Sequence, residues 1–452
     1  MRTKRSDTKR FVLFLIIVSA IGGVLYGYDL GIISGAMAFM NKDIAMSNTQ
    51  LHMMPGAVLF GGAFATLITG PLCDWYGRRK MIIAAAVVFL FGVLIITTAT
   101  NFTELLAGRL IQGLGVGVVT IAIPLYLAEA VPPAIRGEAI CTFQLLLTAG
   151  ILLSSLVGLY FTQGGNWRAM FCSALAPGIL LLVGGCLLPE SPRWLCLQGE
   201  YKKAMTALRK SRSEEAAERE LNQMQISIQN SLSKTNGSIR LWQKQFSKPL
   251  LIVLTVACLG QLTGINSFLQ LAPTILKSAG LGSDMIAMIG NSAITGLNFI
   301  ITIVALLLID RLGRRFLLCL GTCGIIVALA YSGAVFYFMP TSELKGVLLL
   351  SGILGFIFFF AIGPGVVIWM VISELLPLRI RSSGMAVALF LNSMTSAILA
   401  TVFLGLAEKI GYYGVFWLCA FFTLLYFLTV FFFVPETKNK TLEEIEGHFQ
   451  EV

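Results

Sequence analysis

The stretch Asp74-Trp75-Tyr76-Gly77-Arg78-Arg79 recurs in altered form as Asp310-Arg311-Leu312-Gly313-Arg314-Arg315, and this repetition decides the fold. Each copy follows one long apolar run and precedes another. The turn Pro189-Glu190-Ser191 recurs in the same way as Pro435-Glu436-Thr437. This pattern predicts an internal duplication of two membrane halves. Duplicated halves are typical of transporters in which one half rocks against the other around a central site.

The composition places these repeats in a membrane protein. Of the 452 residues, 56% are hydrophobic and 12% are charged, whereas a soluble domain has about 25% charged residues. A helix needs about 20 apolar residues to cross the hydrocarbon core. The apolar runs are long and lack the alternating polar positions of barrel strands, which predicts an all-α membrane protein. We expect twelve transmembrane helices near residues 11–40, 52–72, 81–100, 105–130, 139–161, 167–188, 249–276, 285–309, 316–338, 345–376, 383–407 and 412–434.

The positions of the basic residues predict the orientation. The net charge is +10, and most basic residues fall on the cytoplasmic side if the N-terminus is inside, as the positive-inside rule requires. We therefore expect a multi-pass protein of the plasma (inner) membrane with both termini cytoplasmic, in contact with anionic lipid and not with nucleic acid. The exceptions are Arg109 inside a span and, on the external side, Lys42, Arg168, Lys277, Lys345 and Lys409.

A long polar segment separates the two predicted halves. Within it Leu221, Met224, Ile228 and Leu232 recur at helical spacing, which predicts short amphipathic helices under the bundle; a solvated regulatory loop is the alternative. We expect a monomer. The predicted organisation is an N-terminal six-helix half at 1–188, an intracellular helical linker at 189–248, a C-terminal six-helix half at 249–435 and a cytoplasmic tail at 436–452.

Two charged residues inside predicted spans are candidates for proton coupling. Asp29 lies in the first span, and Arg109 lies at the start of the fourth. An acid near mid-membrane costs about 2.5–3.5 kcal/mol on insertion scales, so it usually faces a cavity or a partner. We expect Asp29 and Arg109 to pair. Either Asp29 carries a proton, or the pair stays ionised and has a structural role.

Amide side chains in otherwise apolar spans indicate the substrate. Amides both donate and accept hydrogen bonds, which suits neutral molecules rich in hydroxyl groups, and an indole adds an apolar stacking face. A hydrogen bond between helices explains any single amide equally well. Their origin in several spans of both halves favours a central site. The candidate substrate-binding residues are Gln144, Gln261, Asn266, Asn298, Trp369 and Asn392.

Charged residues at the predicted cytoplasmic helix ends form a third group. Glu129 and Arg136, for example, recur as Glu374 and Arg381. Pairs among these ends could hold the inner side closed, and because a partly exposed pair contributes about 0–1 kcal/mol, they would bias the equilibrium without locking it. The alternative is that these charges only set the topology. The predicted gating network comprises Asp74, Arg78, Glu129, Arg136, Glu190, Asp310, Arg314, Glu374, Arg381 and Glu436.

The sequence gives no sign of metal or enzyme chemistry. The nine cysteines and two histidines form no Cys/His cluster, and most cysteines lie in or beside spans. We interpret them as small core residues and expect no metal site, no disulfide framework and no cofactor. No nucleophile, base and orienting residue occur together, so we expect no enzyme activity.

Taken together, these motifs resemble the sugar porter family of the major facilitator superfamily over essentially the whole chain. The resemblance implies a twelve-helix fold with alternating access, in which the amides and Trp369 line the sugar site. It also implies proton coupling, since an acid matching Asp29 is associated with proton-coupled members and an asparagine there is typical of uniporters. The matching motifs are Gly27-Tyr28-Asp29, Gly70 through Arg79, Gly108-Arg109, the Glu129 to Arg136 spacing, Pro189 through Trp194, Gln261 to Asn266, and Pro435-Glu436-Thr437-Lys438.

The sequence departs from the family pattern at positions that affect substrate choice. The glutamine doublet usual at the start of span seven is Gly260-Gln261, the aromatic pair usual after Asn266 is Gln270-Leu271, and Ser393 stands where a tryptophan is common. We expect a proton-coupled symporter of a neutral sugar, with a hexose as first choice and a pentose or an inositol-like polyol open. A uniporter is the nearest alternative, followed by a drug exporter and a nontransporting sugar sensor.

Overall fold

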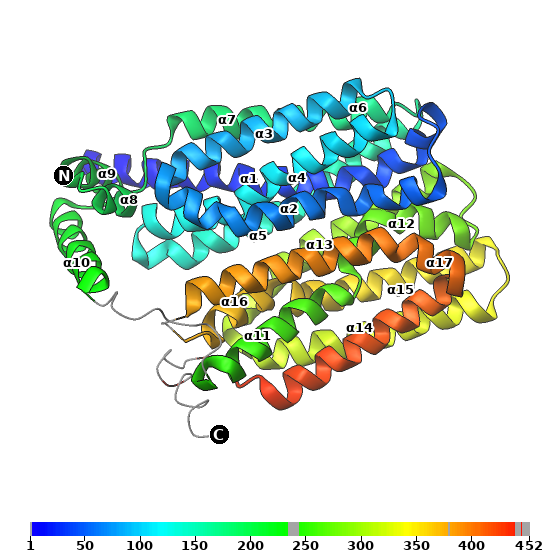
Figure 1. Cartoon of the computed structure of the whole chain (residues 1–452). Helices are drawn as coiled ribbons and strands as arrows, with labels where there is room; N and C mark the ends of the chain where they lie inside the picture. The colour runs from blue at the N-terminus through cyan, green and yellow to red at the C-terminus, as the bar shows by residue number, and fades with distance from the viewer. Residues whose placement is uncertain (1, 234–243, 378–379, 439–443, 445–452) are drawn as a thin grey trace.

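The computed structural model describes residues 2–233, 244–377, 380–438 and 444, and every regular element in these ranges is a helix. Figure 1 shows two layers of long helices, which we call the N-terminal half and the C-terminal half. The N-terminal half contains α1 (Arg2–Asp43), α2 (Asn48–Tyr76), α3 (Arg78–Thr98), α4 (Phe102–Ala130), η1 (Pro133–Ile135), α5 (Arg136–Thr162), α6 (Trp167–Cys172) and α7 (Leu175–Leu187). The C-terminal half contains α11 (Lys244–Leu262), α12 (Ile265–Ala279), α13 (Asp284–Leu312), α14 (Arg314–Phe338), α15 (Glu343–Ile362), α16 (Pro364–Leu375) and α17 (Arg381–Phe433).

The bundle has the length and surface of a membrane domain. Among the described residues, eleven stretches are long and apolar enough to cross a membrane, and the last of them bends at Gly411, where φ is 73°. The pieces on either side of that glycine each exceed the roughly 20 residues that a crossing needs, in agreement with the predicted twelve spans. Large apolar side chains such as Phe91 and Phe432 are 56% and 68% exposed, which suits contact with lipid.

Two predicted spans are each broken into two helices in the C-terminal half. The span predicted at 249–276 breaks between α11 and α12, where Gly264 has a left-handed φ of 88°. The span predicted at 345–376 breaks at Gly363, because Pro364 lacks a backbone N–H and disfavours helical geometry in the residue before it. Broken helices at membrane depth are typical of substrate and ion sites in transporters.

Close packing of α1 against α5 fixes the position of the predicted proton carrier. A Cβ atom on Gly27 would lie 1.8 Å from the carbonyl oxygen of Leu147, and one on Gly31 would lie 3.0 Å from that of Ile151. Both positions therefore require glycine, since any side chain would separate the two helices. Asp29 lies between these glycines on α1.

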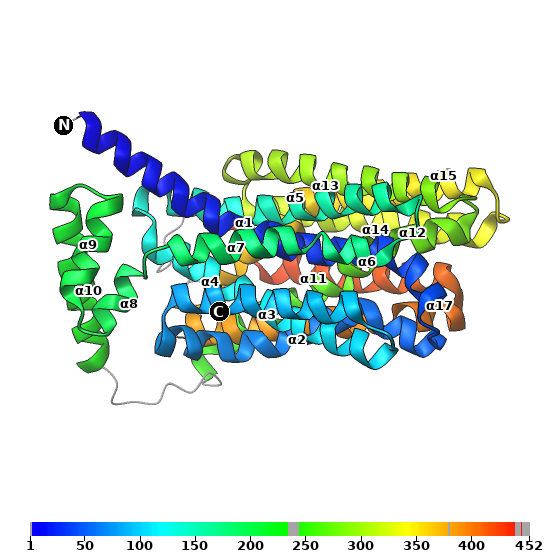
Figure 2. The ribbon, with the colours of Figure 1, turned by 90° about the horizontal axis from the view of Figure 1, so that it is seen from above.

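The first residues of α1 and the last residues of α17 lie at the same end of the bundle, which we call the terminal end (Figure 1). The linker helices α8 (Pro192–Leu197), α9 (Tyr201–Ser211) and α10 (Glu214–Ser233) stand at this end beside α1 (Figure 2). Leu221, Met224 and Ile228 pack against α8 and α9, as their spacing predicts; the side chain of Leu232 lies outside the described residues. Arg212 binds Glu220 and the carbonyl of Ala130, which fastens the linker to α4.

Candidate functional site

Asp29 on α1 and Arg109 on α4 form a buried ion pair in the N-terminal half. Arg109 Nη1 lies 3.0 Å from Asp29 Oδ1, and the two side chains are 1% and 0% exposed. The Phe171 ring lies 5.5 Å from the guanidinium carbon and covers it. Asp29 Oδ2 has no hydrogen-bond partner among the described residues. A proton can therefore add to this oxygen without first displacing Arg109.

Gln112 is a third member of this cluster that the sequence analysis did not identify. Its Oε1 accepts a hydrogen bond of 2.9 Å from the same Nη1 of Arg109 that binds Asp29. Gln112 follows Arg109 by three residues on α4, so the two side chains share a face of the helix. The spacing of three residues was the only signal for this contact, and nothing in the sequence indicated which neighbouring side chain the guanidinium would bind.

Three of the predicted amides form a hydrogen-bonded network at the break between α11 and α12. Asn266 Nδ2 donates to Gln261 Oε1 at 3.0 Å, and Gln261 Nε2 donates to Asn392 Oδ1 at 3.3 Å. Asn266 Nδ2 also donates to Ser396 Oγ at 2.7 Å, which links α12 to α17. The network holds the two sides of the break at fixed positions. It agrees with the alternative interpretation, in which these amides make hydrogen bonds between helices.

The remaining predicted substrate residues approach from other helices. Gln144 on α5 reaches across the interface to the carbonyl oxygen of Gly365, at 3.5 Å, which is too long for a strong bond. Trp369 follows Gly365 by one turn on α16. Asn298 on α13 is only 6% exposed, and its amide has no hydrogen bond to a described residue. Gln144 and Asn298 thus keep free hydrogen-bonding capacity for a ligand, and their role remains a prediction.

Arg78 organises the charged residues at the terminal end of the N-terminal half. It lies 2.9 Å from Asp74 on α2 and 2.9 Å from Glu129 on α4. Glu129 also accepts a hydrogen bond from the hydroxyl of Ser191, the residue before α8. Arg78 and Glu129 are almost fully buried, so removing Arg78 would leave the Glu129 carboxylate buried without its cation.

Glu190 and Glu436 occupy equivalent positions in the two halves. Glu190 accepts from the backbone N–H of Arg79 at 3.1 Å, at the start of α3. Glu436 accepts from the N–H groups of Arg314 and Arg315, at 2.9 and 3.1 Å, at the start of α14. Each carboxylate therefore caps a helix whose positive dipole end it also neutralises. This shared role explains why the two turns recur in the sequence.

Arg314, Glu374 and Arg381 of the predicted gating network lie in the C-terminal half. Arg314 Nε lies 3.8 Å from Glu374 Oε1, and Arg381 donates to the carbonyl oxygen of Leu376 at 3.1 Å. Both contacts lie inside the C-terminal half.

Arg136 pairs with the linker, since its Nη2 lies 3.9 Å from Glu220 Oε1. The side chain of Asp310 lies outside the described part of the chain. The ion pairs described above at the terminal end each join residues of one half, or a half and the linker. If these residues form a gate between the halves, as predicted, they do so in another conformation of the protein.

Apart from the long contact of Gln144, the hydrogen bonds that the structure describes between the two halves lie toward the opposite end of the bundle, which we call the distal end. Asn291 on α13 donates from Nδ2 to Ser34 Oγ on α1 and to Ser155 Oγ on α5, both at 3.1 Å. Ser155 also lies 3.0 Å from the hydroxyl of Ser292. We call Ser34, Ser155, Asn291 and Ser292 the distal cluster. All four are neutral and come from three separate stretches of the sequence, so the sequence analysis did not select them.

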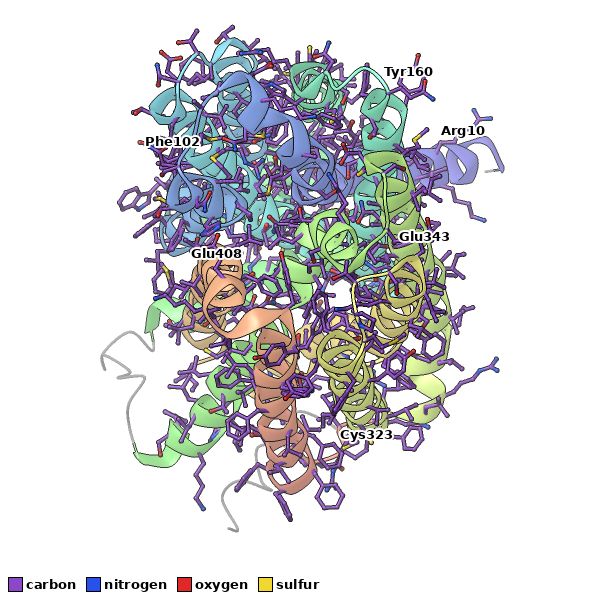
Figure 3. All side chains as sticks on the ribbon, turned by 90° about the vertical axis from the view of Figure 1, so that its right-hand side faces the viewer. Arg10, Phe102, Tyr160, Cys323, Glu343 and Glu408 are labelled. Atoms are coloured by element: carbon purple, nitrogen blue, oxygen red, sulfur yellow. The ribbon has the colours of Figure 1, made fainter. Side chains whose placement is uncertain are left out.

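A second contact between the halves lies at the distal rim. His52 on α2 lies 3.4 Å from Glu408 on α17, and Asn48 donates to the same carboxylate. Figure 3 views the molecule from this end and shows Glu408 on the side of its half that faces the other half. The halves therefore meet at the distal end through two separate polar contacts.

Two pseudo-symmetric helical halves, one with a buried ion pair and the other with broken, amide-bearing helices, define a transporter of the major facilitator fold. The chain matches the model of the family described as "Sugar (and other) transporter" over residues 15–449 and belongs to that family. This finding confirms the resemblance drawn from the motifs.

Individual relatives extend over the whole chain. The chain is 32% identical to the glucose transporter of Staphylococcus epidermidis, covering 97% of each protein. It is 33% identical to the arabinose-proton symporter of Bacillus subtilis, covering 98% of this chain and 96% of that protein. Among solved structures it resembles the inward open conformation of the xylose transporter of Escherichia coli, with a TM-score of 0.82, 26% identity and coverage of 97% of this chain and 99% of that one.

Proposed function

We propose that this protein is a secondary active transporter that carries a neutral sugar across the membrane together with a proton. The observation that carries the proposal is the buried Asp29–Arg109 pair with an unbonded carboxylate oxygen. The relatives support it, since one is named an arabinose-proton symporter and another a glucose transporter. A hexose is the first choice of substrate, with a pentose or an inositol-like polyol next.

The cycle follows from the contacts. A proton added to Oδ2 of Asp29 removes the charge that holds Arg109, so the guanidinium keeps only hydrogen bonds to neutral acceptors, Asp29 Oδ1 and Gln112 Oε1. Sugar hydroxyls then bind between the halves, to the free amides of Gln144 and Asn298 and to the network at Asn266. Rocking of the halves exchanges the distal contacts for contacts at the terminal end, where the gating residues lie. Sugar and proton leave together. The cycle needs no cofactor, metal or covalent step, and the protein is not an enzyme.

The topology belongs to the same proposal. The terminal end faces the cytoplasm, so both termini and the linker lie inside the cell, and the distal end faces outward in the plasma (inner) membrane. The division at residues 188, 248 and 435 separates two six-helix halves, a linker and a tail. The protein works as a monomer in contact with membrane lipid.

Proton coupling is tested with purified protein in liposomes. Addition of a transported sugar should make the external medium more alkaline, and the variant Asp29→Asn should lose accumulation against a gradient but keep exchange of sugar across the membrane. The reason is that exchange needs only the rocking of a loaded protein, whereas accumulation needs the proton. Persistent accumulation in Asp29→Asn would contradict the assignment.

A uniporter is the second candidate, because the salt bridge between Asp29 and Arg109 is also consistent with a permanently ionised pair. It predicts sugar flux without proton movement in the same experiment. Binding of sugar without any flux would favour a sensor instead.

A further inference from the structure

Gln270 on α12 is a buried amide without a hydrogen-bond partner in the part of the chain that the structure describes. Its side chain is 2% exposed, and neither Oε1 nor Nε2 has a hydrogen-bond partner among the described residues. Burying an amide without partners costs free energy, and such groups are rare in native structures. The neighbouring amides of Gln261, Asn266 and Asn392 are bonded to one another, so Gln270 differs from them in having both its donor and its acceptor free.

The helix geometry places Gln270 beside the predicted sugar site. Gln270 follows Asn266 by four residues, so the two side chains lie on one face of α12 about 6 Å apart along its axis. Phe268 stacks on Phe416 and contacts Phe356 inside the C-terminal half. Because Gln270 is two residues from Phe268, it points roughly 200° away from that aromatic core. This direction is toward the N-terminal half, whose helix α1 packs against α12.

A second free acceptor lies at a similar depth. Asn291 uses its Nδ2 to hold Ser34 and Ser155, and its Oδ1 has no partner among the described residues. Counted from the turn that joins α12 and α13, Gln270 lies about 14 Å and Asn291 about 10 Å along their helices. The two packed helices thus present unsatisfied amide atoms on the distal side of Asn266.

We propose that Gln270 binds a substrate hydroxyl that lies beyond the part of the sugar held near Asn266, and that it makes the site selective for six-carbon polyhydroxy substrates over pentoses. This inference rests on the proposed function. A hydroxyl both donates and accepts, as a free amide requires. A hexose has one more hydroxyl-bearing carbon than a pentose and an inositol has two more, so either can reach the second amide. A pentose leaves Gln270 buried and unpaired, and a site built to bond a hydroxyl discriminates strongly against a substrate that lacks it.

The test compares wild type with Gln270→Leu, which keeps the size of the side chain and removes its polar atoms. Equilibrium binding is measured in detergent for a hexose, an inositol, a pentose and the set of monodeoxy analogues of the hexose. Wild type should bind the six-carbon substrates at least tenfold more tightly than the pentose. Gln270→Leu should lose at least tenfold in affinity for them and change less than twofold for the pentose.

The deoxy analogues give a readout that a purely structural role would not produce. Removing one particular hydroxyl from the hexose should weaken its binding to wild type at least tenfold. The same removal should not affect binding to Gln270→Leu, because that variant already lacks the hydrogen bond that the hydroxyl makes. Equal losses for every substrate, or an unchanged deoxy pattern, would overturn the inference. Thr429→Ala on α17 is the control, since the Thr429 hydroxyl bonds only within its own helix. If Gln270→Leu does not fold, Gln270→Met replaces it, and the deoxy pattern then decides in the same way. Absence of sugar binding by wild type would refute the proposed function, and this inference with it.

Discussion

Arg109 shares a single nitrogen, Nη1, between Asp29 and Gln112, so the glutamine still binds the guanidinium when the carboxylate is neutral. The Gln112 side chain is completely buried and its Nε2 has no partner among the described residues. Its position is therefore fixed by the bond that it accepts from Arg109. A glutamine three residues after an arginine has many explanations in a sequence, and only the fold shows that both turn toward α1.

Replacing Gln112 by leucine should destabilise the protein. The substitution removes an acceptor from a buried charged donor, a change that costs about 1.5–3 kcal/mol in the free energy of unfolding. Thermal or denaturant unfolding in detergent measures it. Gln163→Leu, an exposed site at the end of α5, is the matched control and should change stability by less than about 0.5 kcal/mol. Equal stability of the two variants would show that Gln112 does not hold Arg109.

At the scale of the helices, α3 and α14 begin with the same local structure in the two halves. Gly77 and Gly313 precede these helices with φ values of 95° and 92°, and a carboxylate from the turn after the sixth or twelfth span lies against each glycine. A Cβ on Gly313 would lie 2.7 Å from Glu436, and one on Gly77 would lie 2.4 Å from Glu190. The sequence repeat therefore preserves a complete local structure, which includes a left-handed residue, a helix start and its cap.

Replacement of either capping carboxylate by alanine should lower stability by a similar amount, because the two caps are equivalent. Loss of a cap costs about 0.5–2 kcal/mol, and for Glu190→Ala and Glu436→Ala we expect about 1–2 kcal/mol each, including the interaction with the helix dipole. Unfolding measurements on each variant check this. Glu215→Ala is the control, since that side chain is 90% exposed. If one variant loses much stability and the other loses none, the two turns are similar in sequence but their caps do not stabilise the protein equally.

The twelve spans were predictable because hydropathy and length alone determine them, whereas the breaks inside spans were not. The runs at 249–276 and 345–376 stay apolar through Gly264 and Gly363, so the hydropathy pattern gives no sign of a break at either residue. Only the backbone conformation at these glycines, and Pro364 after one of them, divides the helices. The Asp29–Arg109 pair could be predicted since each is the sole charge of its kind deep in a span. The distal cluster could not, because single serines and an asparagine in apolar helices give no signal of their partners.

For the whole molecule, the distribution of contacts shows which end holds the halves together. At the distal end, hydrogen bonds from Asn291 join α13 to α1 and α5, while His52 and Glu408 join α2 to α17. Glu408 is more than half exposed, so that pair contributes at most about 1 kcal/mol. The bonds of Asn291 are fully buried and cannot be replaced by water while the halves are closed. The distal cluster is therefore the stronger of the two contacts.

Replacing Asn291 by alanine should shift the protein toward a form that is open at the distal end. The variant loses two neutral hydrogen bonds, each contributing about 0.5–1.5 kcal/mol, and a loss of about 1.4 kcal/mol changes a two-state equilibrium about tenfold. Hydrogen exchange of the backbone amides near Ser34 and Ser155 should become faster, since these segments become accessible to water. Thr429→Ala, whose hydroxyl bonds within α17 alone, should leave exchange unchanged. If exchange near Ser34 is the same in Asn291→Ala and in this control, the halves are held together by apolar packing, and the distal cluster has no part in choosing which side of the membrane the site faces.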